Sequence, residues 1–288
     1  MVWEGAFRRS AARPSGGMVN SGGPYGRLKN MAAAAALLVA LGMATDARGN
    51  PASLMIWPIH PVIRSDERAA ALWLENRGTR PVTVQVRVLA WLQEEYADRY
   101  EDQPDALIPS PPLATIAPGR RQLVRLTRLV EAPAGQETAY RVLVDELPDA
   151  ERDAAATDTG PQTALGVNLR MRYSLPLFVY GRGLEPATMP AAADHSIRPQ
   201  PPAASWRVVE EGARRWLQVT NHGRHHLRLS HVRFVRPIEG FDLAPGLLGY
   251  VLPGATMRWP VPAEAPAGDG VTLEARVNGA PALTIARR

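Results

Sequence analysis

Four histidines in the last quarter of the chain are the residues whose type first suggests chemistry. They are His222, His225, His226 and His231. Imidazole nitrogens bind transition metals, but the chain has no cysteine and no carboxylate beside these histidines to complete a ligand set. The pattern therefore favours an exposed hairpin rich in His and Arg, with no metal site.

An acidic group in the first half is the other candidate for chemistry, because paired carboxylates can act as general acid and base. Its members are Glu94, Glu95, Asp98, Glu101 and Asp102. They fall in a polar connection between predicted strands, where solvated charge is the expected role. The sequence also contains no G-x-S-x-G, Walker, H-E-x-x-H or EF-hand motif. We therefore predict no catalytic residue and no cofactor, so the protein is not expected to be an enzyme.

A regular alternation of apolar and polar residues marks the segment 166–179. One parity is apolar and the other is polar or basic: Val167, Leu169, Met171, Tyr173 and Leu175 against Asn168, Arg170, Arg172 and Ser174. A period of two predicts a β-strand with one apolar face and one basic face. Pro176 then interrupts the run, and proline occurs in sheets mainly at edges. The strand is either half of an ordinary core or an edge strand kept open for a partner.

Short alternating runs separated by Pro, Gly and Asn make up the rest of the chain. None shows helical spacing over three turns, and turn signals recur about every ten residues, which predicts an all-β sandwich. The unit Leu-x-Leu-x-Asn-x-Gly at 72–78 recurs as Leu-x-Val-x-Asn-x-Gly at 217–223. Two related sandwiches explain this repeat, and chance is the alternative because Asn-x-Gly turns are common.

The N-terminus has the order of a secretory signal. Arg27 and Lys29 precede an apolar run at 31–44, and small residues follow at 45–47. The run is too short to span a bilayer comfortably, and no later segment is long and apolar enough. We interpret 1–47 as leader and signal peptide, with translation starting at Met18 or Met31.

The composition outside the leader narrows the class of protein. Six of the 33 basic and two of the 28 acidic residues lie in the first 48, so the remainder is nearly neutral and gives no case for nucleic acid. The absence of cysteine excludes disulfides, a lipoprotein anchor and a cysteine nucleophile. We predict one domain at 50–182, a Pro- and Ala-rich linker at 183–204, and a second β-sandwich at 205–288.

The order of these motifs resembles the PapD-like periplasmic chaperones of pilus and fimbria assembly. The resemblance is to their divergent, archaic-type branch, whose edge strand reads close to L-R-x-S-L-P-V-F-V. The matching pieces run in family order over most of 53–179: Leu54 to Ile63, Leu74 to Asn76, Pro111-Pro112, Ala117 to Gly119, Gln122 to Leu126, Tyr140 to Pro148, and Leu169 to Val179. The second half matches only by its length and sandwich pattern.

This resemblance implies two immunoglobulin-like β-sandwich domains and a function in the periplasm. Chaperones of this family lend an edge strand to pilus subunits that lack one strand, and then pass the subunits to an outer-membrane usher. The physical principle is β-augmentation, in which main-chain hydrogen bonds supply affinity and alternate side chains supply fit. The residues that would be lent here are Val167, Leu169, Met171, Tyr173 and Leu175.

The family also anchors the C-terminal carboxylate of the subunit on basic residues in a cleft between the domains. This sequence departs from the best-known branch, because His60 stands at the arginine position and Ser174 at the lysine position. The candidates for the anchor are therefore Arg172, Arg125 and His60, since an arginine can hold a carboxylate through two parallel hydrogen bonds. Alternatively, Arg172 is a strand-face charge that deters unwanted pairing.

A different function is also compatible with two sandwiches. The chain contains seven tryptophans, and tryptophan rings can stack on sugars, so a surface adhesin or carbohydrate-binding module is the alternative. Most of these tryptophans fall within predicted strands, where packing in a core or on a sheet face is the simpler role.

Overall fold

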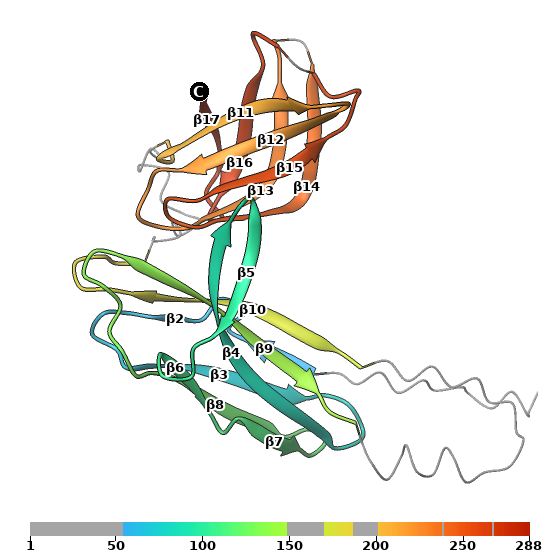
Figure 1. Cartoon of the computed structure of the whole chain (residues 1–288). Helices are drawn as coiled ribbons and strands as arrows, with labels where there is room; N and C mark the ends of the chain where they lie inside the picture. The colour runs from blue at the N-terminus through green and yellow to red at the C-terminus, as the bar shows by residue number, and fades with distance from the viewer. Residues whose placement is uncertain (1–53, 149–169, 187–200, 238, 267) are drawn as a thin grey trace, which may run out of the picture. The chain divides into compact units, whose positions relative to one another are not determined.

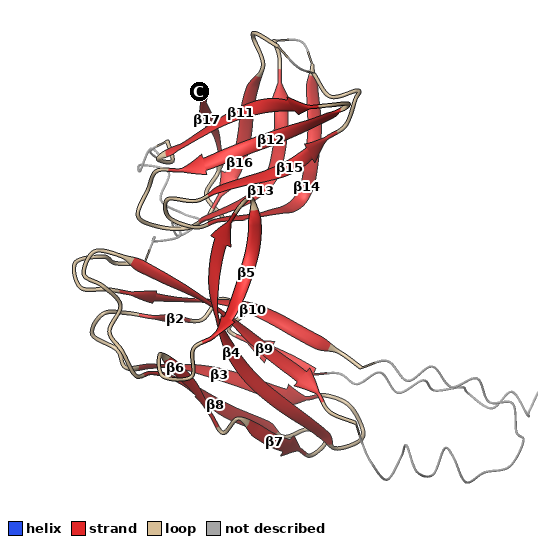
Figure 2. Ribbon diagram, in the orientation of Figure 1, coloured by secondary structure: helices blue, strands red, loops and turns tan. Residues whose placement is uncertain are grey.

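The computed structural model describes residues 54–148, 170–186, 201–237, 239–266 and 268–288. The predicted signal peptide, Val167 and Leu169 lie outside these ranges. All regular structure within them is β-strand, as Figure 2 shows by its single colour for regular elements. Consequently, none of the described segments is a helix of the length and apolarity that crossing a membrane requires. The described residues all fall within one compact unit.

The first ten strands build a sandwich of two sheets (Figure 1). The first sheet has the order β1-β3-β8-β6, and the second has the order β2-β10-β9-β4-β5, with β7 also paired to β4. The strands are β1 (Leu54–Trp57), β2 (Val62–Ile63), β3 (Ala69–Asn76), β4 (Val82–Glu94), β5 (Ala97–Asp102), β6 (Leu107–Ser110), β7 (Leu113–Ile116), β8 (Arg121–Arg128), β9 (Glu137–Glu146) and β10 (Arg172–Tyr180).

The core of this sandwich follows from the period of two. Leu72 and Leu74 of β3 are 0% exposed and pack in one cluster with Val142 and Val144 of β9, while the intervening residues face outward. Burial of these alternating rows on two facing sheets is the main source of stability. The prediction of an all-β sandwich is confirmed.

The second sandwich is a seven-stranded sheet that folds over on itself, in the order β14-β13-β16-β17-β11-β12-β15. Trp206 and Phe234 lie at its centre, with ring centroids 5.7 Å apart. Its strands are β11 (Ala204–Glu211), β12 (Arg214–Asn221), β13 (Leu227–Val235), β14 (Gly240–Val251), β15 (Thr256–Val261), β16 (Thr272–Val277) and β17 (Ala282–Arg287).

The two Asn-x-Gly units of the sequence form the same buried corner in both sandwiches. Asn76 Nδ2 donates to the carbonyls of Arg80 (2.6 Å) and Ile116 (2.9 Å), and its Oδ1 accepts from the Gly78 amide (2.9 Å). The corner at 221–225 repeats this arrangement, with Asn221 donating to two carbonyls and accepting from the Gly223 amide. Both asparagines are 0% exposed, so each satisfies backbone groups that water cannot reach.

The acidic group predicted to lie in an irregular connection instead belongs to a β-hairpin. β4 continues to Glu94 and β5 begins at Ala97, joined by Glu95 and Tyr96 with positive φ angles of 51° and 65°. The sequence did not predict this strand, because all six residues of β5 are exposed and show no apolar alternation, although their exposure agrees with the predicted solvated charge.

Candidate functional site

β10 is an edge strand along most of its length. It pairs with β9 from Arg172 to Tyr180, but on its other flank it meets only β2, at Phe178 and Val179. Among the described residues, no strand pairs with that flank from Arg172 to Leu177. The open flank of β10, meaning the unpaired side of 172–177, is therefore free to accept another strand.

The backbone groups on this open flank can be assigned from one hydrogen bond. The Phe178 amide donates to the Pro61 carbonyl on the β2 side at 3.4 Å. Alternate residues of a strand direct their backbone groups to the same flank, so Arg172, Ser174 and Pro176 share this side. Arg172 and Ser174 offer N–H donors and carbonyl acceptors there, whereas Pro176 offers only its carbonyl.

The side chains of the predicted lent row become progressively more buried along the strand. Met171 is 45% exposed, Tyr173 is partly buried against the core, and Leu175 is 7% exposed within the core cluster. The described strand starts at Arg172, so Met171 lies just before it. Met171 and Tyr173 thus remain available to a partner, while Leu175 already packs inside its own sandwich.

A cavity of about 650 Å³ lies beside the open flank. It is bounded by β1 and β10, which are edge strands of the two facing sheets, by the loop after β1, and by β13 and β14 of the second sandwich. Its apolar lining is Leu54, Met55, Ile56, Ile59, Tyr173, Leu175, Pro176, Leu247 and Tyr250, and its basic lining is His60, Arg141, Arg172 and Arg228. The cavity is thus an apolar groove with cationic groups.

Arg141 and Arg228 are the arginines of this cavity that have no carboxylate partner within the described part of the chain. Arg141 lies on β9, and its Cζ atom is 3.7 Å from the centroid of the Trp91 ring. The Nε atoms of Arg141 and Arg228 are buried and have no hydrogen-bond partner among the described residues. No carboxylate of the described residues forms an ion pair with either guanidinium. Buried donors without acceptors cost about 1–3 kcal/mol each, so an incoming anion would relieve this cost.

His60 contributes to the cavity as a neutral group rather than as a charge. Partial burial lowers the pKa of His60 below its ordinary value, and electrostatic interactions with Arg228, His226 and Arg141 lower it further. A histidine with a lowered pKa is uncharged at neutral pH. The arginines, which stay protonated, therefore supply the positive charge of the cavity.

Arg172 is already engaged by a carboxylate. It forms a hydrogen-bonded ion pair with Asp145 on β9, and Asp145 also accepts from Arg87 on β4 at 2.9 Å. Burial would raise the pKa of Asp145, but the hydrogen bonds from Arg172 and Arg87 outweigh it and hold the pKa below its ordinary value. Arg172 therefore lines the cavity and is at the same time paired with a carboxylate of its own sheet.

Arg125, the third predicted anchor, lies elsewhere. It is an exposed residue of β8 in the first sheet, opposite Ala71 and Ser110, and it does not line the cavity. The structure therefore brings together His60 and Arg172 of the predicted set, and adds Arg141 and Arg228.

Sequence reasoning missed these two arginines for different reasons. The alternation of apolar residues at 140–144 places Arg141 on the face of β9 that points away from the core. This pattern could have identified Arg141 as a surface cation of the strand. Arg228 belongs to β13 of the second sandwich, where it pairs with Tyr250 on β14. No local pattern in the sequence indicates that this strand borders the same cavity.

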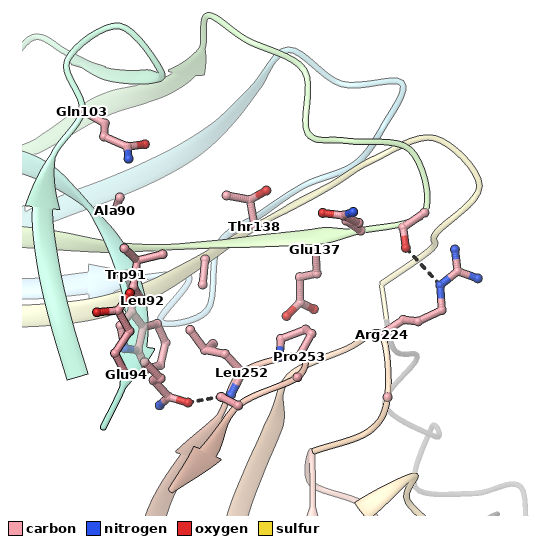
Figure 3. Close-up of a pocket in the computed structure, with 17 residues that line it drawn as sticks. Ala90, Trp91, Leu92, Glu94, Gln103, Glu137, Thr138, Arg224, Leu252 and Pro253 are labelled. Carbon is pink, nitrogen blue, oxygen red and sulfur yellow. Dashed lines mark hydrogen bonds between the residues drawn. The ribbon is translucent and has the colours of Figure 1, made fainter. Parts of the chain in front are cut away.

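A second cavity, of about 620 Å³, is lined by residues of both sandwiches and is drawn in Figure 3. Hydrogen bonds at its margin join the two sandwiches. Gln93 donates to the Tyr250 carbonyl (3.0 Å) and accepts from the Leu252 amide (2.8 Å). Arg224 donates to the Gly135 carbonyl at 3.0 Å, shown as a dashed line in Figure 3. This margin is a structural junction, because its polar groups already have partners.

His226, predicted to be exposed, is instead part of this junction. Its backbone amide donates to Glu137 Oε1 (2.9 Å), and its Nδ1 lies 3.0 Å from the same carboxylate. The imidazole stacks on Phe178, with ring centroids 3.6 Å apart. The Glu137 side chain is 0% exposed, so this contact satisfies a buried carboxylate. The described residues contain no group of His, Asp and Glu that could hold a metal ion.

Comparisons with known proteins agree with this geometry. The family "Pili and flagellar-assembly chaperone, PapD N-terminal domain" matches residues 55–185. One similar solved structure is the complex of the CsuC chaperone with the CsuE tip adhesion subunit, from the archaic chaperone-usher Csu pili of Acinetobacter baumannii. The matched chain of that complex is 30% identical in sequence to this chain. The alignment covers 82% of this chain and 100% of the matched chain, with a TM-score of 0.62. A search of curated proteins gave no match.

More distant structures share the fold. The YadV chaperone is 15% identical over 80% of this chain and 96% of its own, with a TM-score of 0.54. The SafB chaperone, solved with the SafA pilin of Salmonella enterica, is 17% identical over 81% of this chain and 94% of that chain, with a TM-score of 0.52.

A chaperone fold of two immunoglobulin-like sandwiches with an open edge strand is thus established. The chain belongs to the PapD-like family of pilus-assembly chaperones, as the sequence predicted. This is a family of chaperones and not of enzymes, and it favours the chaperone prediction over an adhesin or carbohydrate-binding module.

Proposed function

We propose that this protein captures pilus subunits by lending them the open flank of β10. The observation that carries the proposal is the unpaired edge at 172–177 beside an apolar cavity. A subunit that lacks one strand exposes an apolar groove and unpaired backbone groups. Pairing with β10 satisfies those groups, while Met171 and Tyr173 enter the groove, together with Val167 and Leu169 of the predicted row.

The capture needs no cofactor or nucleotide, because burial of apolar surface is favourable by about 25 cal/mol per Å². Met171 suits the role, since its flexible thioether adapts to grooves of different shape. Leu175 contributes indirectly by fixing β10 in its own sandwich, where it is 7% exposed.

The cationic part of the cavity would hold the C-terminal carboxylate of the subunit. Arg141 and Arg228 are the better pair for this anchor, because their buried Nε atoms have no acceptor in the part of the chain that the structure describes. Arg172 adjoins them but is held by Asp145, and His60 supplies a neutral hydrogen-bonding group. Two guanidinium groups can grip one carboxylate through charge-assisted hydrogen bonds.

The partners that follow from this proposal are pilus subunits and an outer-membrane usher, and the compartment is the periplasm. Support comes from family membership and from the similar chaperone, which was crystallised with a tip adhesion subunit as a pre-assembly complex of the chaperone-usher class. The predicted signal peptide at 1–47 supports export.

Co-expression with each pilus subunit of the same organism tests the proposal. A tagged chaperone should recover a soluble 1:1 complex from the periplasm, and subunits expressed alone should be degraded or aggregate. Recovery of soluble subunits without the chaperone, or failure of all subunits to co-purify with it, would contradict the proposal.

A further inference from the structure

Two large apolar side chains are left exposed in the cavity, and they come from different sandwiches. Ile59, in the loop after β1, is 61% exposed, and Leu247, on β14, is 52% exposed. A single exposed apolar residue is common on protein surfaces. Here two such residues line the same cavity, beside two arginines without a carboxylate partner among the described residues, and the lending of the strand does not itself require them.

The cationic groups of the cavity also come from both sandwiches. Arg141 belongs to β9 of the first sandwich and Arg228 to β13 of the second. Arg228 is paired with Tyr250, and Leu247 is paired with Ser230, so both side chains belong to the β13–β14 hairpin. Each sandwich thus contributes one arginine and one exposed apolar residue to the cavity.

The position of β2 indicates which part of a guest reaches this place. β2 occupies the flank of β10 at Phe178, so a strand added along 172–177 must end beside Pro176. Arg141 is the residue opposite Pro176. A guest strand with its N-terminal ammonium group at this place would be repelled by two arginines. A guest strand with its C-terminal carboxylate there would be attracted to them.

We propose that Ile59 and Leu247 form a pocket for the last side chain of the subunit, so that the second sandwich helps to select subunits that end in a large apolar residue. The inference rests on the proposed function. In this arrangement the terminal carboxylate binds Arg141 and Arg228, and the terminal side chain packs between Ile59 and Leu247. A polar terminal residue would leave the two apolar side chains exposed to water and would bind more weakly.

Three synthetic peptides with one alternating Val/Thr sequence test this pocket: one ends in Leu, one in Ser, and one in Leu amide. Binding to the full-length chaperone is measured by calorimetry. The Leu-ended acid should bind about tenfold more tightly than the Ser-ended acid, because one side chain is largely removed from water. The amide should lose affinity whatever the pocket contains, because it lacks the carboxylate.

A double variant, Ile59→Ser with Leu247→Ser, should remove the preference for Leu over Ser but keep the preference for acid over amide. Both positions are exposed, so the fold should be retained. Leu113→Ser, at a residue that is 55% exposed on β7 and outside the cavity, is the matched control and should change neither preference.

An unchanged preference for Leu in the double variant would overturn the inference, as would the absence of any preference in the wild type or no binding of the Leu-ended peptide. Co-expression with intact subunits separates this result from a failure of the proposed function. If subunits are still captured, only the terminal pocket is wrong; if none is captured, the proposed function fails as well.

Discussion

Arg141 on β9 lies directly opposite Pro176 on β10, and its guanidinium rests 3.7 Å from the centroid of the Trp91 ring. The ring holds the cation by its π-electrons without neutralising it. Asp145, further along β9, instead accepts from Arg172. The open flank therefore begins beside an arginine paired with a carboxylate and ends beside one that has no carboxylate partner among the described residues.

Replacing Arg141 by Ala should weaken subunit capture strongly. Loss of one partner of a desolvated charge pair costs about 2–5 kcal/mol. Affinity for a purified, strand-deficient subunit can be measured by calorimetry or by competition. Arg125→Ala is the control, because that residue is exposed on the other sheet. Equal affinities of the two variants would rule out Arg141 as an anchor.

Met171→Asp should abolish recovery of a co-expressed subunit and leave the chaperone folded. Met171 is 45% exposed, so the free protein should change in stability by no more than about 0.5 kcal/mol. In the complex, however, the carboxylate would be buried in an apolar groove without a partner. Met171→Leu, which keeps the volume, should retain capture. A normal yield of complex from the Asp variant would show that Met171 does not enter the subunit.

The stability of the first sandwich should fall in acid partly through Asp145. Since its pKa is held below the ordinary value in the folded protein, Asp145 stabilises the fold above about pH 4. This contribution is lost as the pH falls through the lowered folded pKa. Both arginines are partly exposed, which limits the effect to about 1 kcal/mol.

Urea unfolding at pH 6 and pH 3 should therefore show a smaller loss of stability for Asp145→Asn than for the wild type. Asp102→Asn, at an exposed position of β5, is the comparison and should follow the wild type. Unaltered acid sensitivity in the Asp145→Asn variant would mean that the ion pairs are too weak to matter.

Asn76→Ala and Asn221→Ala should each destabilise the sandwich that contains the residue. Either change leaves two carbonyls and one amide without their partner in a buried corner, at about 1–3 kcal/mol for each unsatisfied group before relaxation. Hydrogen exchange resolved by segment should show faster exchange in β1–β10 for the first variant and in β11–β17 for the second. Thr83→Ala, which loses one exposed hydrogen bond to Thr115, should have little effect.

The repeated asparagine corner explains why so much of the fold could be predicted. A strand with a period of two, followed by Asn-x-Gly, is a pattern within a few consecutive residues. Such a local pattern can be recognised from the sequence alone. The alternation that ends at Pro176 predicted β10 as a strand but left open whether it lies in a core or at an edge, and the resemblance to the chaperone family indicated the edge. β5 escaped detection because all its residues are exposed and carry no alternation.

The cavity could be predicted only in part because it is assembled from distant segments. His60 and Arg172 were found by their place in motifs, whereas Arg228 reaches the cavity from the second sandwich. Whether Arg172 is available also depends on Asp145, a neighbour across the sheet that the sequence does not mark. Such pairings follow from strand register, and register is not visible in a single strand.

The shortness of β2 has a consequence for the range of guests. β2 pairs with β10 only at Phe178 and Val179, so it limits the open flank of β10 at one end. No described strand limits the other end of this flank. If subunits pair with this edge as proposed, their C-terminal ends would align beside β2, and differences in the length of the paired strand would fall near Met171. Under the proposed function, one chaperone would then accommodate subunits of different strand length at the same carboxylate site.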